Sequence, residues 1–201
     1  MRYYYYVSVR IFKGESILHT RLAKKEDIGQ IRSLWQYCFF DEAYYLDWVF
    51  GKRFCVDNAL VAEREGRICG ALQLVPYTIH IRQHQELCYY IAGVSVLPQE
   101  RGRGTATALM AFAEQIALER KISLLLLVPA LGGYYERFGF VHVTSKMEFE
   151  FPVELAAPYR FHGRACQAEG TEDLLAVDQA YNEFWDVHID RSQQDMRQLL
   201  Q

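Results

Sequence analysis

The sequence lacks any pair of cysteines spaced as in a metal or redox motif. Its five cysteines are scattered and odd in number, which favours neither a disulfide framework nor a zinc site (Cys38, Cys55, Cys69, Cys88 and Cys166). We interpret them as reduced thiols, mostly in the core. No charge-free apolar run approaches the ~18 residues of a membrane span, and the first residues lack the order of a signal peptide. We therefore expect a soluble cytoplasmic protein.

The chain also lacks an excess of positive charge. It has 22 Lys and Arg against 25 Asp and Glu, giving a net charge of -3. No overall positive field attracts nucleic acid or an anionic membrane, so we expect neither as a partner. A single RGRG at residues 101–104 is too short for an RNA-binding tract. Any anion must therefore be held locally.

With 201 residues the chain can form one full domain and part of another. Residues 1–16 form an N-terminal extension to which we assign no function. Hydrophobic periodicity then predicts an α/β protein, in which helices cover the faces of a mixed sheet. The predicted strands are 17–22, 58–65, 67–81, 86–97, 122–128 and two pieces within 140–151, and the predicted helices are 26–35, 42–50, 104–120 and 134–138.

The strand at 122–128 (ISLLLLV) is continuously apolar, which is typical of a strand buried on both faces.

The tail contains a weak internal repeat. Asp27 is followed by apolar residues at offsets +1, +4, +7, +8 and +12, and Asp173 is followed by apolar residues at the same offsets. The repeat suggests that the first helix of the domain recurs, although two amphipathic helices can also resemble each other without a common origin.

The most informative stretch is VSVLPQERGRGTATALM at residues 94–110, where a strand pattern passes through two glycines into a helix. The first N–H groups of a helix have no intrahelical acceptor and lie at the positive end of its dipole. Gly102 and Gly104 allow the backbone to approach a ligand, Ala106 keeps the next turn slim, and Arg101 and Arg103 can bond phosphate oxygens. The stretch therefore predicts a pyrophosphate site.

Two familiar phosphate motifs do not fit this loop. A Walker loop needs Gly-Lys-Ser/Thr, where this chain has Gly-Thr-Ala-Thr at 104–107. A dinucleotide fingerprint needs a third glycine where this chain has Thr107, and a parallel βαβ unit where it has an antiparallel meander.

The sequence RGRGTA at residues 101–106, following a strand that ends in VSVLP, resembles the acetyl-coenzyme A loop of the GNAT superfamily of N-acetyltransferases. YERFGF at residues 135–140 is similar to the Tyr-x-x-x-Gly-Phe segment of that superfamily. The resemblance covers about residues 18–151 and implies a GNAT-like fold, with a mixed, mostly antiparallel sheet and helices on both faces.

ALGGYY at residues 130–135, together with the repeated pattern in the tail, more narrowly resembles the Eis-like branch of the superfamily. That branch joins an acetyltransferase domain to a second domain of the same fold and a sterol-carrier-like domain. The resemblance implies a GNAT domain at 17–151 and a C-terminal extension at 152–201 that begins a second such domain.

The resemblance also implies roles for particular residues. The backbone of one strand end would pair with the pantetheine arm (Val94, Ser95 and Val96), and the loop would hold the pyrophosphate (Arg101, Gly102, Arg103, Gly104, Thr105, Ala106 and Thr107). Tyr135 would be the general acid that protonates the departing thiolate in a direct attack by the amine. The co-substrate would be acetyl-coenzyme A, and we expect no metal.

The general base stays open among Glu63, Asp41 and Glu42. We expect no cysteine nucleophile, because Cys69 and Cys88 have no histidine partner nearby in the sequence. We likewise expect structural roles for His80, His84 and Tyr134.

By analogy with the family, residues 39–48 would line the acceptor side. Their aromatic and acidic side chains suit a cationic primary amine, on either a small molecule or a lysine. Two alternatives also stay open: a non-catalytic acyl-coenzyme A binding or scaffold module, and a fragment too incomplete to act. Whether the chain forms a homo-oligomer stays open as well.

Overall fold

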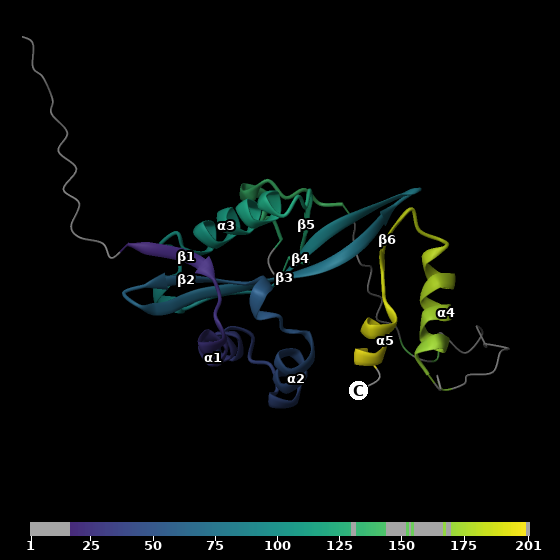
Figure 1. Ribbon diagram of the computed structural model, residues 1–201, viewed down its shortest axis with the longest axis horizontal. Helices are drawn as coiled ribbons and strands as arrows, with labels where there is room; N and C mark the ends of the chain where they lie inside the picture. The colour runs from purple at the N-terminus through teal and green to yellow at the C-terminus, as the bar shows by residue number, and fades with distance from the viewer. Residues whose placement is uncertain are drawn as a thin grey trace, which may run out of the picture. The chain divides into compact units, whose positions relative to one another are not determined.

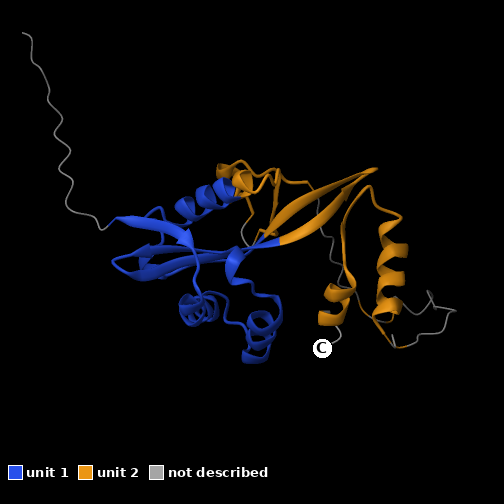
Figure 2. Ribbon diagram, in the orientation of Figure 1, with its two compact units in different colours: residues 1–75, 91–116 blue, residues 76–90, 117–201 orange. Residues whose placement is uncertain are grey.

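The computed structural model describes residues 17–129, 132–143 and 170–199, together with residues 152, 154 and 167. The predicted extension at 1–16 and the strand-like pieces beyond residue 143 lie outside the described residues. The chain divides into two compact units (Figure 2). Unit 1 comprises residues 1–75 and 91–116, and unit 2 comprises residues 76–90 and 117–201.

A six-stranded sheet runs through the chain in the order β1-β2-β3-β4-β5, with β6 also paired to β3 (Figure 1). The pairs β1–β2, β2–β3 and β3–β6 are antiparallel, whereas β4–β5 is parallel. The strands are β1 (Leu18–Leu22), β2 (Ala59–Arg64), β3 (Arg67–Ile81), β4 (His84–Val96), β5 (Leu124–Leu126) and β6 (Val187–Asp190). The predicted fold class, a mixed and mostly antiparallel α/β sheet, is confirmed.

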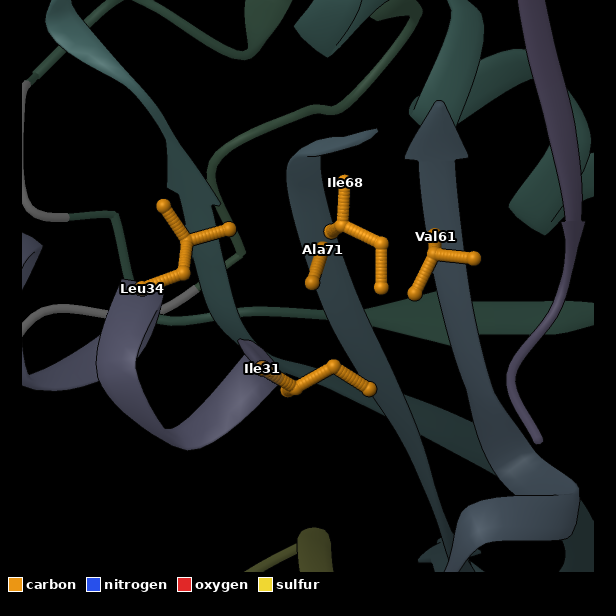
Figure 3. Packing of buried hydrophobic residues seen from close by; sticks show 5 residues of the cluster. All are labelled: Ile31, Leu34, Val61, Ile68 and Ala71. Atoms are coloured by element: carbon orange, nitrogen blue, oxygen red, sulfur yellow. The ribbon is translucent and has the colours of Figure 1, made fainter. Parts of the chain in front are cut away.

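In unit 1 the helices cover both faces of the strands (Figures 1 and 2). Helix α1 (Ile28–Phe39) packs on one face, where Ile31 and Leu34 join a buried cluster with residues of β2 and β3 (Val61, Ile68 and Ala71; Figure 3). Helix α2 (Ala43–Trp48) continues as a π-helix, Val49–Arg53. Helix α3 (Thr105–Glu119) packs on the opposite face, because its Thr105 and Leu109 lie against Gly70, the neighbour of Ala71 in β3.

Gly93 interrupts β4 with a backbone φ of +60°. A side chain at this position would overlap the six-membered ring of Trp35 in α1. Trp35 is 9% exposed, packs with Leu46 and Val49, and donates a 2.8 Å hydrogen bond from Nε1 to Asp41 Oδ2. Position 93 therefore needs glycine for two reasons, which are its left-handed backbone and the close approach of the indole.

Unit 2 departs from the sequence-based prediction in two strands. β5 is only three residues long and half-buried, not the strand buried on both faces that we expected at 122–128. The reason is that β5 stands at the end of the described strand order and pairs with β4 over residues 88–90 alone. The second departure is β6, which the sequence did not predict and which pairs with β3.

The remaining elements of unit 2 are helical. A 3-10 helix, Glu136–Phe138, occupies the segment predicted as a short helix, and residues 140–143 continue without regular structure instead of starting the expected strand. Helix α4 (Thr171–Asn182) confirms the predicted helix of the tail, and α5 (Gln193–Leu199) follows β6. Unlike α1, α4 buries none of its residues, and its Val177 is 68% exposed.

Among the described residues, no helix has the length and apolar character needed to cross a membrane.

Replacing Gly93 by alanine should lower the free energy of unfolding by about 2–4 kcal/mol, because the left-handed backbone and the overlap with Trp35 both oppose a Cβ. Gly29→Ala in α1 is the matched control, since a Cβ there meets no atom within 4 Å. That control should leave stability unchanged or raise it by up to about 1 kcal/mol. Urea unfolding of the three proteins measures both effects, and an equal loss in the two variants would contradict the explanation.

Candidate functional site

The glycine loop of unit 1 connects β4 to α3. β4 ends at Val96, a 3-10 helix covers Pro98–Glu100, and a turn then leads into α3. In the turn, Arg101 N–H donates to Pro98 O at 3.2 Å and Arg103 N–H donates to Glu100 O at 3.4 Å. Gly102 and Gly104 have φ values of +75° and +83°, and a Cβ on either residue would meet no atom within 4 Å. Backbone conformation, rather than crowding within the chain, therefore selects glycine at both positions.

The first turn of α3 presents backbone N–H groups that the helix cannot satisfy. Ala108 N–H donates the first bond of the helix, to Gly104 O at 2.9 Å. The N–H groups of Thr105, Ala106 and Thr107 precede it and so have no acceptor within the helix. Thr105 is buried, and its hydroxyl donates to Glu100 O at 3.3 Å, while Thr107 is exposed. These N–H groups and the helix dipole favour an anion at this position.

The two loop arginines lie in different environments. Arg103 Nη1 is 2.8 Å from Glu100 Oε1, and Arg64 Nε is 2.9 Å from Glu100 Oε2. Glu100 is only 8% exposed, and the side chain of Arg64 is 11% exposed, so this ion pair is largely excluded from water, whereas the side chain of Arg103 is 44% exposed. Arg101 is exposed and donates from Nε to Val96 O at 3.2 Å. Arg103, which we predicted as a phosphate ligand, therefore has a protein carboxylate as its partner. The charges of Arg64, Glu100 and Arg103 together sum to +1.

Sequence reasoning missed Glu100 and Arg64. Glu100 is adjacent to the loop, but its partner Arg64 is 36 residues away, and no local pattern connects the two.

The end of β4 is partly occupied by hydrogen bonds within the chain. Ser95 is buried and its hydroxyl donates to Ala71 O at 3.3 Å. The carbonyl of Val96 accepts from Arg101 Nε and from the Cys38 thiol, at 3.2 and 3.6 Å. The pairing of β4 with β5 covers residues 88–90, so Val94 lies beyond that ladder. The carbonyl of Val96 thus has two partners within the chain, although the family resemblance implies that this segment is free to pair with a ligand.

In unit 2, Tyr135 precedes the 3-10 helix, and Gly139 ends that helix with a φ of +85°. The Tyr135 ring packs edge to face against Tyr134 and Phe140, with centroids 5.1 and 6.1 Å away. Burial raises the pKa of its phenol above 10, and interactions with Tyr134 and Tyr90 raise it further. The phenol is therefore protonated at neutral pH and can donate a proton.

The two adjacent tyrosines differ in their hydroxyl partners. Arg137 Nη2 donates to the Tyr134 hydroxyl at 2.9 Å and places its Cζ 4.3 Å from the centre of the Tyr134 ring. Within residues 17–129, 132–143 and 170–199, no group forms a hydrogen bond with the Tyr135 hydroxyl. Tyr134 therefore has the packing role that we predicted for it, whereas the Tyr135 hydroxyl can bond a ligand.

Two of the three candidate bases have partners in the structure. Arg21 Nη2 is 2.9 Å from Glu63 Oε2, and Asp41 accepts the hydrogen bond from Trp35. Glu42 is exposed at the start of α2. The geometry thus leaves Glu42 as the candidate with the fewest competing contacts.

The buried cysteines are unsuited to nucleophilic catalysis. Burial raises the pKa of the Cys69 and Cys88 thiols, and the charge of Glu100 raises that of Cys69 further. Both are therefore protonated at neutral pH and lack the thiolate that a nucleophile needs.

A family model described as an acetyltransferase (GNAT) domain matches residues 19–143. The structure of a GCN5-related N-acetyltransferase from Anabaena variabilis is similar, with a TM-score of 0.55 and 26% identity, covering 60% of this chain and 31% of that chain. A GNAT family acetyltransferase from Brucella melitensis, solved in complex with acetyl-CoA, has a TM-score of 0.53 and 27% identity, covering 64% and 85% of the two chains.

Eis1 from Mycobacterium abscessus is similar with a TM-score of 0.54 and 15% identity, covering 61% of this chain and 31% of that chain. At this identity the likeness concerns the fold alone. This chain thus spans less than a third of the length of the Anabaena protein and of Eis1. No curated protein matches it in sequence.

Replacing Glu100 by glutamine should lower the free energy of unfolding by about 3 kcal/mol, because Arg64 and Arg103 would lose their shared, largely buried counter-charge. Glu114→Gln, on the exposed side of α3, makes the same chemical change without this ion pair and should change stability by less than about 0.5 kcal/mol. Urea unfolding measures both variants. If Glu100→Gln were as stable as Glu114→Gln, the carboxylate would not organise the loop.

Proposed function

This chain belongs to the GNAT acetyltransferase family, and we propose that it transfers an acetyl group from acetyl-coenzyme A to a primary amine. The observation that carries the proposal is the start of α3, where two left-handed glycines and three N–H groups without intrahelical acceptors are suited to binding a pyrophosphate. The Brucella melitensis relative, solved with acetyl-CoA, supports the choice of donor.

We assign the pyrophosphate to the N–H groups of Thr105, Ala106 and Thr107, with added charge from Arg101. Arg103 would contribute as one member of the Glu100 ion-pair cluster rather than as a free cation. The backbone of Val94 is our candidate for pairing with the pantetheine arm, because the carbonyl of Val96 already accepts two hydrogen bonds.

For the chemical step we propose direct attack. The amine nitrogen forms a bond to the thioester carbonyl carbon, the carbon–sulfur bond breaks, and the electron pair of that bond remains on sulfur. Tyr135 then donates its phenolic proton to the thiolate. Its raised pKa keeps the proton in place beforehand, and its hydroxyl has no competing partner among the described residues. The amine loses its own proton to solvent or to a carboxylate, for which Glu42 is our candidate.

We propose a cationic amine as acceptor, on a small molecule or on a lysine. The segment between α1 and α2 and the first turn of α2 expose large aromatic rings beside acidic residues, with Phe40 85% and Tyr44 76% exposed. Aromatic faces and carboxylates both attract ammonium groups.

We further propose an Eis-like organisation in which residues 152–201 begin a second domain. Both repeated patterns form helices, α1 and α4, and α4 buries none of its residues against the rest of the described chain. We also propose that the protein acts in the cytoplasm, because its described cysteines are free thiols, which a reducing compartment maintains.

Thr107→Glu should weaken acetyl-coenzyme A binding at least about 10-fold in calorimetric titration, because it places a negative charge in the first turn of α3. The same charge should stabilise the helix by about 0.3–1 kcal/mol through the helix dipole. Thr107→Gln, of similar size and uncharged, is the control and should bind almost normally. Unchanged binding by the glutamate variant would refute the pyrophosphate assignment.

Tyr135→Phe should lower kcat about 100-fold or more while leaving the affinity for acetyl-coenzyme A unchanged, because only the proton donor is removed. Tyr134→Phe should leave kcat within a few-fold, since that hydroxyl only accepts a hydrogen bond from Arg137. Steady-state assays with a panel of amines, paired with calorimetry, measure both quantities. If the wild type binds the donor yet acetylates no amine, the alternative of a non-catalytic binding module gains support.

A further inference from the structure

In unit 2, two histidines and an aspartate converge on one face of the β3–β6 pair. We propose that His80, His188 and Asp190 bind a divalent transition-metal ion, with zinc the best fit, and that the ion ties β6 to β3. The sequence suggested no metal site, because His188 is 108 residues from His80 and no short motif contains both.

The strand register brings the three side chains together. His80 in β3 lies directly opposite His188 in β6, and residues paired in this way project from the same face. Asp190 is two residues after His188 in β6, so its side chain shares that face. The two imidazole rings stack with centroids 4.7 Å apart and an angle of 11° between their planes. The convergence thus follows from the pairing of four residues in each strand.

The ligand atoms lie at distances suited to one ion. Asp190 Oδ2 is 2.5 Å from His80 Nε2, and Asp190 Oδ1 is 3.7 Å from His188 Nε2. One ligand atom from each residue lies within 4.8 Å of the other two. Ligands at about 2.0–2.2 Å from a tetrahedral zinc ion are roughly 3.4 Å apart. Small side-chain rotations therefore suffice to place all three around one ion.

The surrounding hydrogen bonds also favour coordination. The Nδ1 atom of His188 is 3.2 Å from Trp185 O, so the proton belongs on Nδ1 and the lone pair of Nε2 faces the cluster. His80 Nε2 contacts both Asp190 Oδ2, which needs a donor, and Gln85 Nε2 at 2.7 Å, which needs an acceptor. A single neutral ring nitrogen cannot serve both. If Nε2 instead binds an ion together with Asp190, rotation of the Gln85 amide turns its oxygen toward the ion and removes the remaining mismatch.

The donor set selects the class of metal. Two imidazole nitrogens and one carboxylate oxygen suit zinc, nickel or copper better than calcium or magnesium, which prefer oxygen ligands. All three residues are half-buried, so a water molecule, or the Gln85 amide oxygen after rotation of the amide, can complete the coordination. The match to the family model covers residues 19–143, so the ion would join a strand within the matched residues to a segment beyond them.

The test uses the full chain, stripped of metal with a chelator and then desalted. Calorimetric titration with zinc chloride should give one saturable site, and zinc at about 100 times its Kd should raise Tm by about 5–10 °C. Cobalt substitution should give the visible absorption bands of a four-coordinate site. No saturable binding, no change in Tm, or a sulfur-to-cobalt charge-transfer band indicating a cysteine ligand would each overturn the proposal.

His188→Gln should weaken zinc binding more than about 100-fold, and Asp190→Asn, which keeps the shape of the side chain, should weaken it by at least about 10-fold. His84→Gln is the matched control, because His84 is an exposed histidine at the start of β4 outside the cluster. Circular dichroism before zinc is added shows whether each variant is folded. If His188→Gln does not fold, Asp190→Asn decides the test. Equal losses in the cluster variants and the control would overturn the proposal.

Discussion

The start of α3 depends on the absence of a side chain in β3. A Cβ at Gly70 would lie 2.8 Å from Thr105 Cγ2, 3.0 Å from Leu109 Cδ1 and 3.2 Å from Ser95 O. Because Gly70 has no side chain, the first turns of α3 and the end of β4 both lie directly against β3. Thr105 is buried there and bonds to the backbone of Glu100, which anchors the loop at its helical end.

The loop places a buried carboxylate next to the N–H groups that we propose bind an anion, and the two are compatible. Glu100 is neutralised by Arg64 and Arg103, and the three charges leave a net of +1. What remains to attract a phosphate is the set of N–H groups in the first turn of α3 and the exposed Arg101. Oriented N–H groups cost little reorganisation when an anion arrives, since the helix already holds them in place. The arginines thus contribute to the shape of the loop as well as to its charge.

Several features were predictable because they depend on neighbouring residues. The period of the apolar residues predicted α1, α3, α4 and the antiparallel strands β2 to β4, and the glycines at 102 and 104 marked the turn before α3. β5 was predicted too long, since a run of apolar residues does not reveal whether a strand has a partner on each edge. β6 was not predicted, because its four residues become a strand only by pairing with β3.

The sequence by itself determined the order of helices and strands as far as β5, the glycine turn before α3, and the motifs that resemble the GNAT family, because each depends on residues adjacent along the chain. Only the tertiary structure decided that Gly70 admits α3 and that Arg64 binds Glu100. It also decided that His80 meets His188, across 108 residues. These contacts join residues far apart in sequence, and their geometry follows from strand register and helix packing, which no local pattern encodes.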